Sequence, residues 1–367
     1  CVVIEGGFII SVGDVASVEV PNGANVIDHG KDLILPGFVD GHVHYPQMNV
    51  IGSFGAKLID WLNTYTFPEE AKFSDKSYAS AIANLFLSES LKNGYTTSSV
   101  FCTTHPQSVD AFFSEADKLG LRMIAGKVLM DRNAPENLLD TAQSSYDQSK
   151  ELIDKWHNKN RALYAVTPRF APTSTPAQLE VAGTLYKECE GVYVQSHVAE
   201  NVEEISWVGE LFQQSTSYLD VYNQFGLLGP RTLYGHGIHF SDADIEMVKD
   251  TDTSIVHCPT SNLFLGSGLF AYQKFKEARV RVALGTDIGG GTSLSPFATM
   301  KAAYEVAQFH NYSLTPFEAF YILTIGGAEA LHLGDRIGRI APGYEADLTV
   351  INLNSTEIIK NRMKQTD

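Results

Sequence analysis

The chain has 367 residues, a formal net charge of −16 and a hydrophobic fraction of 44%. At about 150 residues per domain, this length allows two or three ordinary domains or one large barrel with an accessory part. The near-average composition excludes wholesale disorder. Binding to a phosphate backbone needs clustered Lys and Arg, so the acidic balance argues against nucleic acid and weakly favours a neutral or cationic small molecule.

The four cysteines, at positions 1, 102, 189 and 258, are widely scattered and form no C-x-x-C pair. A disulfide framework of this length would carry more cysteines, so we predict a reducing compartment, the cytoplasm. No run reaches the roughly 18 apolar residues that span a bilayer, and no signal peptide is visible at the start. We therefore expect no membrane association.

The predicted elements begin with two or three short strands within residues 2–20, where apolar runs are broken by glycines. From residue 33 onward, short β-rich segments alternate with stretches of helical spacing such as 77–93, 106–119 and 177–189. The predicted strands are Leu33–Val43, Tyr95–Phe101, Arg122–Met130, Leu163–Phe170, Val192–His197, Thr232–Gly237, Ser254–Cys258 and Arg281–Thr286. Eight strands, each followed by a helical crossover, predict an α/β fold of the (β/α)8 TIM-barrel type.

After the barrel, residues 337–352 return to short strands around a Pro342-Gly343 turn. We predict that the N- and C-terminal segments together form a small, discontinuous β-sandwich domain. The expected boundaries are 1–34 and 337–367 for the two parts of that domain and 35–336 for the barrel.

The strongest single motif is His42-Val43-His44 at the end of the first barrel strand. Residues i and i+2 of a strand point to the same face, so both imidazoles project into the barrel. Two adjacent imidazoles there could begin a zinc or iron site, or they could be two buried, hydrogen-bonded histidines. The motif alone does not decide between these readings.

Other strand ends favour the metal site. The fifth strand ends at His197 and is followed by Glu200, the sixth ends around His236, and the eighth leads into Asp287. Active sites of this fold are built at the carboxyl ends of the strands, where each of these residues falls. The sequence therefore predicts a metal centre there.

A single ion is favoured, because the two-metal barrels of this kind usually bridge their ions with a modified Lys on the fourth strand, which here ends in Thr167-Pro168-Arg169-Phe170. The ligands that we predict for one divalent metal, Zn²⁺ or alternatively Fe²⁺, are His42, His44, His197 and Asp287, with His236 as a possible further ligand. Such a metal lowers the pKa of its water to near 7 and yields hydroxide.

Three residues are candidates for catalysis. Asp287 could accept the proton of that water, and His236 could orient the attacking oxygen. Glu200, three residues after His197, could carry a proton to a ring nitrogen or a leaving amine. Alternatively, Glu200 could complement the dipole of the helix that follows.

Taken together, the motifs H-x-H, H-x-x-E, H-G-x-H and T-D resemble the amidohydrolase superfamily, specifically its mononuclear aminohydrolases, over nearly the whole chain. Five runs are similar to the guanine deaminase family in closer detail: His42 to Gln47, Thr167 to Phe170, Ser196 to Asn201, Val256 to Leu263 and Gly285 to Gly291. The resemblance implies a homodimeric hydrolase that converts guanine to xanthine and ammonia in purine catabolism or salvage.

Carried over by position, the resemblance implies that Gln47 and Arg169 bind the polar edge of the purine, that Phe170 packs on its ring, and that Glu200 contacts it as well. An arginine donor suits a carbonyl, and an aromatic ring suits a flat base. Arg169 could instead form a structural ion pair, and Phe170 could be barrel packing. The second histidine of H-G-x-H, His239, has no assigned role.

Two other functions remain open from the sequence. A related amidohydrolase could act on cytosine, an adenosine derivative or a triazine. A catalytically inactive scaffold of the same fold is a more remote alternative, because such relatives typically lose metal ligands and this chain retains every candidate.

Overall fold

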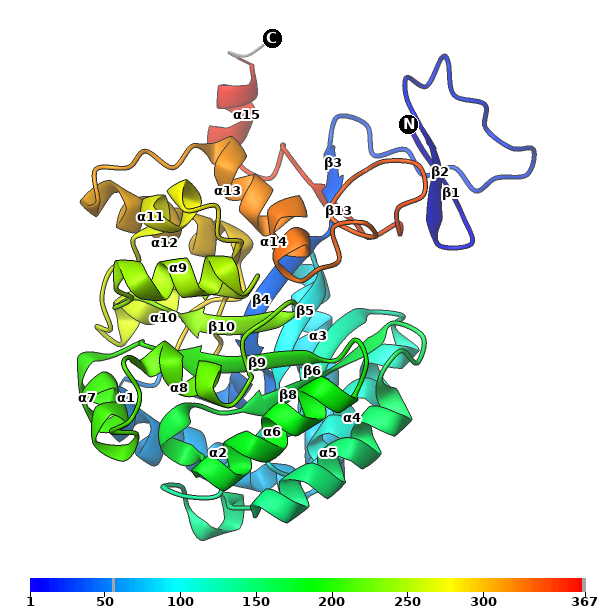
Figure 1. The fold of residues 1–367 in the computed structure, drawn as a ribbon. Helices are drawn as coiled ribbons and strands as arrows, with labels where there is room; N and C mark the ends of the chain where they lie inside the picture. The colour runs from blue at the N-terminus through cyan, green and yellow to red at the C-terminus, as the bar shows by residue number, and fades with distance from the viewer. Residues whose placement is uncertain (55–56, 365–367) are drawn as a thin grey trace.

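The computed structural model describes residues 1–54 and 57–364, and a barrel of parallel strands forms its centre (Figure 1). Neighbouring strands in the barrel follow one another in the chain. They are β4 (Phe38–His44), β5 (Tyr95–Phe101), β6 (Arg122–Gly126), β8 (Ala162–Pro168), β9 (Tyr193–Val198), β10 (Thr232–His236), β11 (Ser254–His257) and β12 (Val282–Leu284), with β7 (Val128–Leu129) beside β8. This order confirms the predicted (β/α)8 fold.

Two backbone hydrogen bonds close the barrel between its first strand and the residues after its last. The N–H of Asp287 donates to the carbonyl of His42 at 2.9 Å, and the N–H of His44 donates to the carbonyl of Ile288 at 2.8 Å. The bonds that close the barrel therefore involve three of the predicted ligands. Closure brings the first and last strand ends together, although they are far apart in the sequence.

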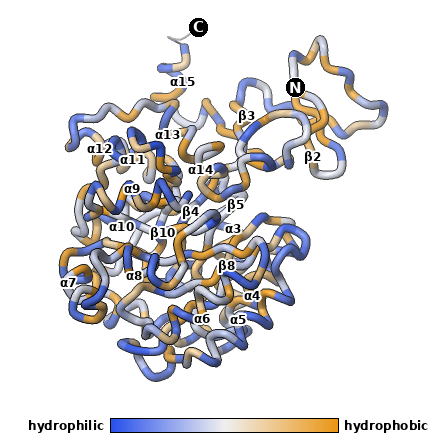
Figure 2. Tube along the Cα trace, in the orientation of Figure 1, coloured by the Kyte–Doolittle hydropathy of each residue, from blue (hydrophilic) through white to orange (hydrophobic). Residues whose placement is uncertain are grey.

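Helices surround the barrel and bury one face each against it. The three predicted helices appear as α3 (Lys76–Lys92), α4 (Pro106–Lys118) and α6 (Pro176–Glu188). α3 and α6 are shifted by one residue at both ends, and α4 starts as predicted and ends one residue earlier. Hydrophobic and hydrophilic residues alternate along outer helices such as α4 (Figure 2). The others are α5 (Ala142–Trp156), α7 (Val202–Leu211), α8 (Tyr218–Gln224), α9 (Asp242–Asp250), α10 (Pro259–Phe264), α11 (Tyr272–Glu277), α12 (Pro296–Phe309), α13 (Pro316–Leu323) and α14 (Ile325–Ala330).

The connection after β4 is long and carries several short helices. They are the 3-10 helix η1 (Tyr45–Val50), α1 (Leu58–Trp61), the π-helix η2 (Leu62–Thr66), α2 (Phe67–Glu70) and the 3-10 helix η3 (Ala71–Ser74). Trp61 and Phe67 are buried in this segment. Because the segment follows the carboxyl end of a barrel strand, its side chains can reach the site described below.

The ends of the chain form two small antiparallel sheets outside the barrel. One pairs β1 (Val2–Glu5) with β2 (Phe8–Val12), and the other pairs β3 (Leu33–Pro36) with β13 (Leu348–Ile351). A bridge between Phe8 and Glu345 connects the segments that carry them, and so do backbone hydrogen bonds such as that from the N–H of Ile9 to the carbonyl of Tyr344 at 2.8 Å. The domain boundaries stay a prediction, and residues 365–367 of the last predicted segment lie outside the described residues.

The predicted strand 33–43 is in fact two strands that belong to different sheets. β3 pairs with β13 at the chain ends, whereas β4 belongs to the barrel. The break falls at Gly37, where a Cβ atom would lie 2.1 Å from Oγ1 of Thr96. Only glycine allows this close approach. The pairing of β3 with β13 could not be predicted from the local sequence. The helix α15 (Glu357–Met363) was not predicted either.

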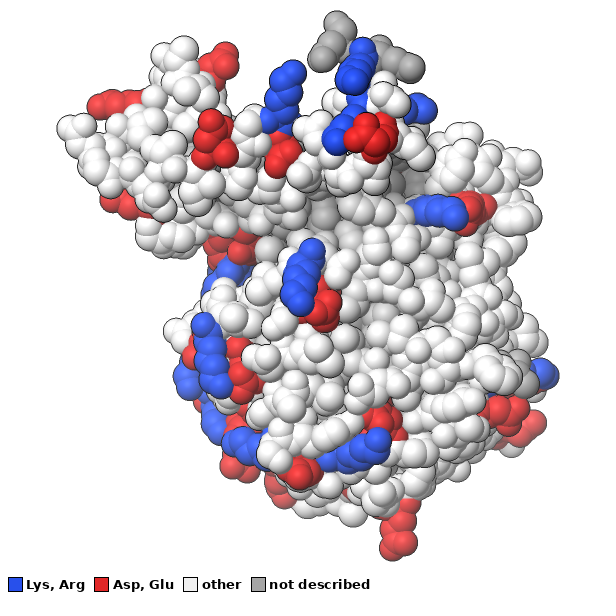
Figure 3. Space-filling model, turned by 180° about the vertical axis from the view of Figure 1, so that it is seen from behind, with Lys and Arg blue, Asp and Glu red and all other residues white. Residues whose placement is uncertain are grey.

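The surface carries both signs of charge. On the face shown in Figure 3, lysines and arginines lie beside acidic side chains rather than in a basic stripe. Among the helices of the described residues, none combines the length and the apolarity needed to cross a membrane.

Candidate metal centre and active site

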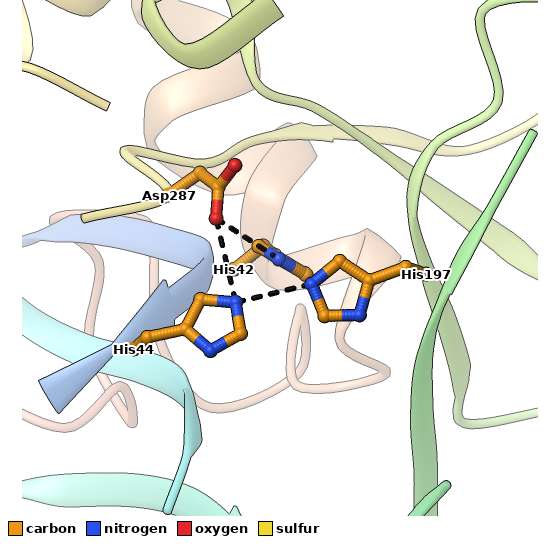
Figure 4. Close-up of side chains that lie close together, drawn as sticks. All are labelled: His42, His44, His197 and Asp287. Atoms are coloured by element: carbon orange, nitrogen blue, oxygen red, sulfur yellow. Dashed lines mark hydrogen bonds and ion pairs between the residues drawn. The ribbon is translucent and has the colours of Figure 1, made fainter. Parts of the chain in front are cut away.

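Four side chains from three strand ends converge inside the barrel (Figure 4). Nε2 of His44 lies 3.1 Å from Nε2 of His197. Oδ1 of Asp287 lies 3.3 Å from Nε2 of His42 and 3.4 Å from Nε2 of His44. One potential ligand atom from each of the four residues lies within 4.8 Å of all the others. The structure thus brings together all four residues predicted as ligands.

The spacing of these atoms fits one divalent cation. Ligand atoms about 2.0–2.2 Å from a zinc ion, at angles between 90° and tetrahedral, lie roughly 3.0–3.5 Å from one another. The three distances above fall in that range. Nε2 of His42 is buried without a hydrogen-bond partner, which is costly unless something else binds its lone pair. Imidazole and carboxylate ligands accept zinc and iron alike.

Contacts with neighbouring groups orient the proposed ligands. Nδ1 of His197 lies 2.6 Å from the backbone carbonyl of Arg169. A carbonyl can only accept, so Nδ1 carries the hydrogen and the lone pair of Nε2 faces the cluster. Burial by itself would raise the pKa of the Asp287 carboxyl, but the close approach of His42 and the neighbouring imidazoles holds that pKa below its usual value.

His236 lies beside the cluster and faces two carboxylates. Its Nδ1 is 2.8 Å from Oδ1 of Asn262, and its Nε2 is 3.5 Å from Oε2 of Glu200 and 3.8 Å from Oδ2 of Asp287. Burial alone would lower the pKa of His236, but the two carboxylates raise it. Its buried Nε2 has no hydrogen-bond partner, so it can serve a metal or a reacting oxygen.

Cys258, which the sequence analysis left without a role in the site, lies close to it. Its Sγ, a nitrogen of His236 and a carboxylate oxygen of Asp287 lie within 4.8 Å of one another. Burial raises the pKa of this thiol well above its usual value, so it is uncharged. The sequence offered no spacing signal for this proximity.

Glu200 is 3% exposed and directs its carboxylate into the site. Its Oε1 accepts a hydrogen bond from Oγ of Ser267 at 2.9 Å, and its backbone N–H donates to Glu204 at 3.0 Å. Burial raises the pKa of Glu200. The following helix, α7, starts two residues later and has Glu203 and Glu204 in its first turn. These two residues fill the place that complements the helix dipole, which leaves the Glu200 carboxylate free to face His236.

A pocket of about 420 Å³, part of it open to solvent, lies over the cluster. Gln47, Arg169 and Glu200 line it beside His44, His197, His236 and Asp287. Its apolar walls are Leu58, Trp61, Leu62, Phe170 and Leu265. The predicted substrate residues therefore share one pocket with His44, His197 and Asp287, three of the four predicted ligands.

Glu70 is the residue of this pocket region that the sequence analysis missed. Its Oε1 accepts from Nε2 of Gln47 at 3.0 Å, and its Oε2 accepts from Nη1 of Arg169 at 2.5 Å. Oε1 of Gln47 accepts from the N–H of Gly289 at 2.9 Å. Arg169 thus forms a buried ion pair and also lines the pocket. A structural role in this ion pair is therefore compatible with a role in substrate binding. Nothing local to Glu70 distinguishes it from a surface acid.

His239 lies apart from the cluster. It is exposed, and its Nε2 is 2.9 Å from the backbone carbonyl of Ser267. It is therefore neither a ligand nor a pocket residue, although it contacts the segment that carries Ser267.

Comparison with known proteins agrees with this geometry. Residues 33–366 match the model of the amidohydrolase family. The chain is 48% identical to the guanine deaminase of Escherichia coli over 340 residues, which are 93% of this chain and 77% of the relative. The structure of the E. coli guanine deaminase superimposes with a TM-score of 0.97 at 46% identity, covering 99% of this chain and 85% of that one.

Two further similar structures contain a bound ligand. A guanine deaminase from C. acetobutylicum with bound guanine in the active site has a TM-score of 0.90 at 34% identity, covering 100% of this chain and 87% of the other. An adenosine deaminase from Xanthomonas campestris with bound zinc has a TM-score of 0.87 at 25% identity, covering 96% and 80%.

The fold, the His/Asp cluster and the match over residues 33–366 define a hydrolase of C–N bonds, and the chain belongs to the amidohydrolase family. Within that family it belongs with the guanine deaminases, since it is 48% identical to one of them over 93% of its length.

Proposed function

We propose that the protein catalyses the hydrolytic deamination of guanine to xanthine and ammonia, as part of purine catabolism or salvage. The observation that carries this proposal is the single pocket that joins the His/Asp cluster to Glu200 and to the Arg169–Gln47 pair. The relative from C. acetobutylicum, which binds guanine in its active site, supports the same substrate.

We propose His42, His44, His197 and Asp287 as the residues that hold one divalent metal, Zn²⁺ or Fe²⁺, with His236 adjacent. A metal held there supplies Lewis acidity and lowers the pKa of water to near 7. The zinc bound to the adenosine deaminase relative favours zinc.

The reaction adds water to the ring carbon that bears the amine and breaks its C–N bond. Asp287 accepts a proton from the water, and His236 orients the attacking oxygen through its partner-free Nε2. Glu200 delivers a proton to the adjacent ring nitrogen and assists the departure of ammonia. Because burial raises its pKa, Glu200 holds a proton more readily than an exposed carboxyl.

Recognition of guanine is assigned to three other residues of the pocket, Arg169, Gln47 and Phe170. Arg169 has N–H donors beyond the one bound to Glu70, and these can reach the guanine carbonyl. Gln47 keeps a second amide N–H free of its bond to Glu70. Phe170, packed edge-on against Trp207, offers its ring to the flat base.

A guanine-to-xanthine absorbance assay with and without a chelator tests the function. We expect activity that the chelator abolishes and that zinc or iron restores. A parallel panel with cytosine, an adenosine derivative and a triazine measures ammonia release. Faster turnover of one of these would overturn guanine as the substrate, and the absence of stoichiometric metal with no turnover would favour an inactive scaffold.

The resemblance to the guanine deaminase family also supports a homodimer, and the scattered cysteines support a cytoplasmic location. Light scattering of the purified protein tests the dimer, and a tagged copy in the source cells tests the compartment.

A further inference from the structure

The segment after α10 holds one oxygen of the Glu200 carboxylate. Ser267 lies in this segment, is 5% exposed and donates its hydroxyl to Oε1 of Glu200 at 2.9 Å. The other oxygen, Oε2, faces Nε2 of His236 at 3.5 Å. One oxygen is therefore bound to the protein, and the other points toward the cluster.

His239 holds Ser267 from the far side. Nε2 of His239 lies 2.9 Å from the carbonyl of Ser267, and since a carbonyl only accepts, the imidazole donates this bond. The backbone N–H of His239 donates to the carbonyl of Ala199 at 3.3 Å. Ala199 directly precedes Glu200 in the chain. Hydrogen bonds therefore connect Ala199 to His239, His239 to Ser267, and Ser267 back to Glu200.

The backbone around Ser267 is packed closely against the segment that carries His239. Gly268 has a φ of +139°, and a Cβ there would lie 2.9 Å from Cγ2 of Ile238. The N–H of Ser267 donates to the carbonyl of Asn262 at 2.9 Å. Because Asn262 also bonds His236, the segment contacts both groups that face the reacting atoms.

We propose that Ser267 is a positioning residue for proton transfer by Glu200, and that His239 holds Ser267 in place. The inference rests on the proposed function, since it assumes that Glu200 carries the proton. A terminal carboxylate torsion is broad, so Glu200 would rotate without a second contact. The Ser267 hydroxyl fixes the plane of the carboxylate, which keeps Oε2 aimed into the pocket, and small misplacements of such groups cost rate steeply.

Single variants test the contact. Ser267→Ala should lower kcat about tenfold and leave the KM for guanine and the metal content unchanged, because it touches neither the recognition pair nor the ligands. Ser267→Thr, which keeps a hydroxyl, should restore most of kcat. His239→Ala should lower kcat about threefold, and His239→Gln, which keeps an N–H donor, should recover it.

A matched control contacts the same segment from another part of the chain. His310 is exposed, and its Nε2 donates to the carbonyl of Leu269 at 3.1 Å, two residues beyond Ser267. His310→Ala removes the same kind of bond without reaching Glu200, so kcat should stay unchanged. An equal loss in His310→Ala and His239→Ala would mean that the segment needs anchoring in general, and the assigned role of His239 would be overturned.

A double-mutant cycle separates positioning from general damage. In a Glu200→Gln background, Ser267→Ala should cause no further loss of kcat, because its effect acts through the carboxylate. The same fold-loss in both backgrounds would overturn the proposal. Should Ser267→Ala fail to fold, as its melting temperature would reveal, His239→Ala in both backgrounds replaces it. A fully active Glu200→Gln would instead overturn the proposed role of Glu200. If Glu200→Gln is inactive but Ser267→Ala is fully active, only the positioning role of Ser267 is overturned.

Discussion

Arg169 and Glu70 form a buried ion pair across the pocket, with Nη1 of the guanidinium donating to Oε2 of the carboxylate at 2.5 Å. Their side chains are only 3% and 1% exposed. The pair joins the end of β8 to the helical segment after β4. Since Glu70 also binds Gln47, one carboxylate fixes both proposed substrate-recognition residues.

Removing Glu70 should therefore harm both stability and substrate binding. Glu70→Ala leaves a buried guanidinium unpaired, which costs about 3–5 kcal/mol of unfolding free energy. It should also raise the KM for guanine, because Gln47 and Arg169 lose their shared partner. Urea unfolding and steady-state kinetics measure the two effects. As a control, Asp242→Asn breaks an exposed ion pair with Lys274 and should change the free energy of unfolding by no more than about 0.5 kcal/mol. An equally small effect of Glu70→Ala would contradict the role of the Arg169–Glu70 pair.

Glu200→Gln should keep its metal and lose most of its turnover, because the amide cannot carry the proton. We expect kcat to fall by about 10²–10⁴, the usual contribution of general acid–base catalysis. Elemental analysis and the xanthine assay together measure this. Glu203→Gln, three residues further on, is the control: Glu203 pairs with exposed Lys57, and its variant should keep normal kcat. Near-normal activity in Glu200→Gln would remove Glu200 from the mechanism.

Loss of one proposed ligand should lower metal occupancy. In His42→Ala the metal content should fall below one ion per chain, and turnover should fall with it, because the remaining donors no longer complete the set. Elemental analysis after dialysis measures the occupancy. Retention of one ion per chain in His42→Ala would show that the metal is held elsewhere.

Glu318 should give the protein a pH-dependent stability that is independent of the active site. Burial raises the pKa of this carboxyl, but hydrogen bonds from Lys276, Tyr312 and Thr315 lower it overall from 4.5 to about 2. A carboxyl whose pKa is depressed on folding stabilises the protein fully above its unfolded value. This stabilisation is lost as the pH falls from 4.5 toward about 2.

We therefore expect Glu318→Gln to be less stable than the parent by about 1–2 kcal/mol at pH 7, allowing for solvent screening of a partly exposed group. The difference should shrink as unfolding is measured at successively lower pH below 4.5. A difference that stays constant down to pH 3 would contradict the assigned pKa.

Most of the barrel, and the convergence of the proposed ligands at one place in it, could be predicted from the sequence. Strand periodicity is local, and residues i and i+2 of a strand share a face whatever the rest of the chain does, so His42 and His44 could be placed together. The rule that active sites lie at the carboxyl ends of barrel strands then placed His197, His236 and Asp287 beside them. The division of residues 33–43 into β3 and β4 could not be predicted, because it depends on pairing with β13, about 300 residues away.

The sequence by itself determined the chemistry that the strand ends can offer, because residue type and strand period are properties of short segments. Only the tertiary structure decided which other residues support that chemistry. Glu70 and Ser267 carry no local pattern, and the places that they take at the site arise from burial and from contacts with residues up to 99 positions away, such as that of Glu70 with Arg169. A carboxylate acquires a raised pKa or a fixed orientation only when distant segments exclude water from it and supply its hydrogen bonds.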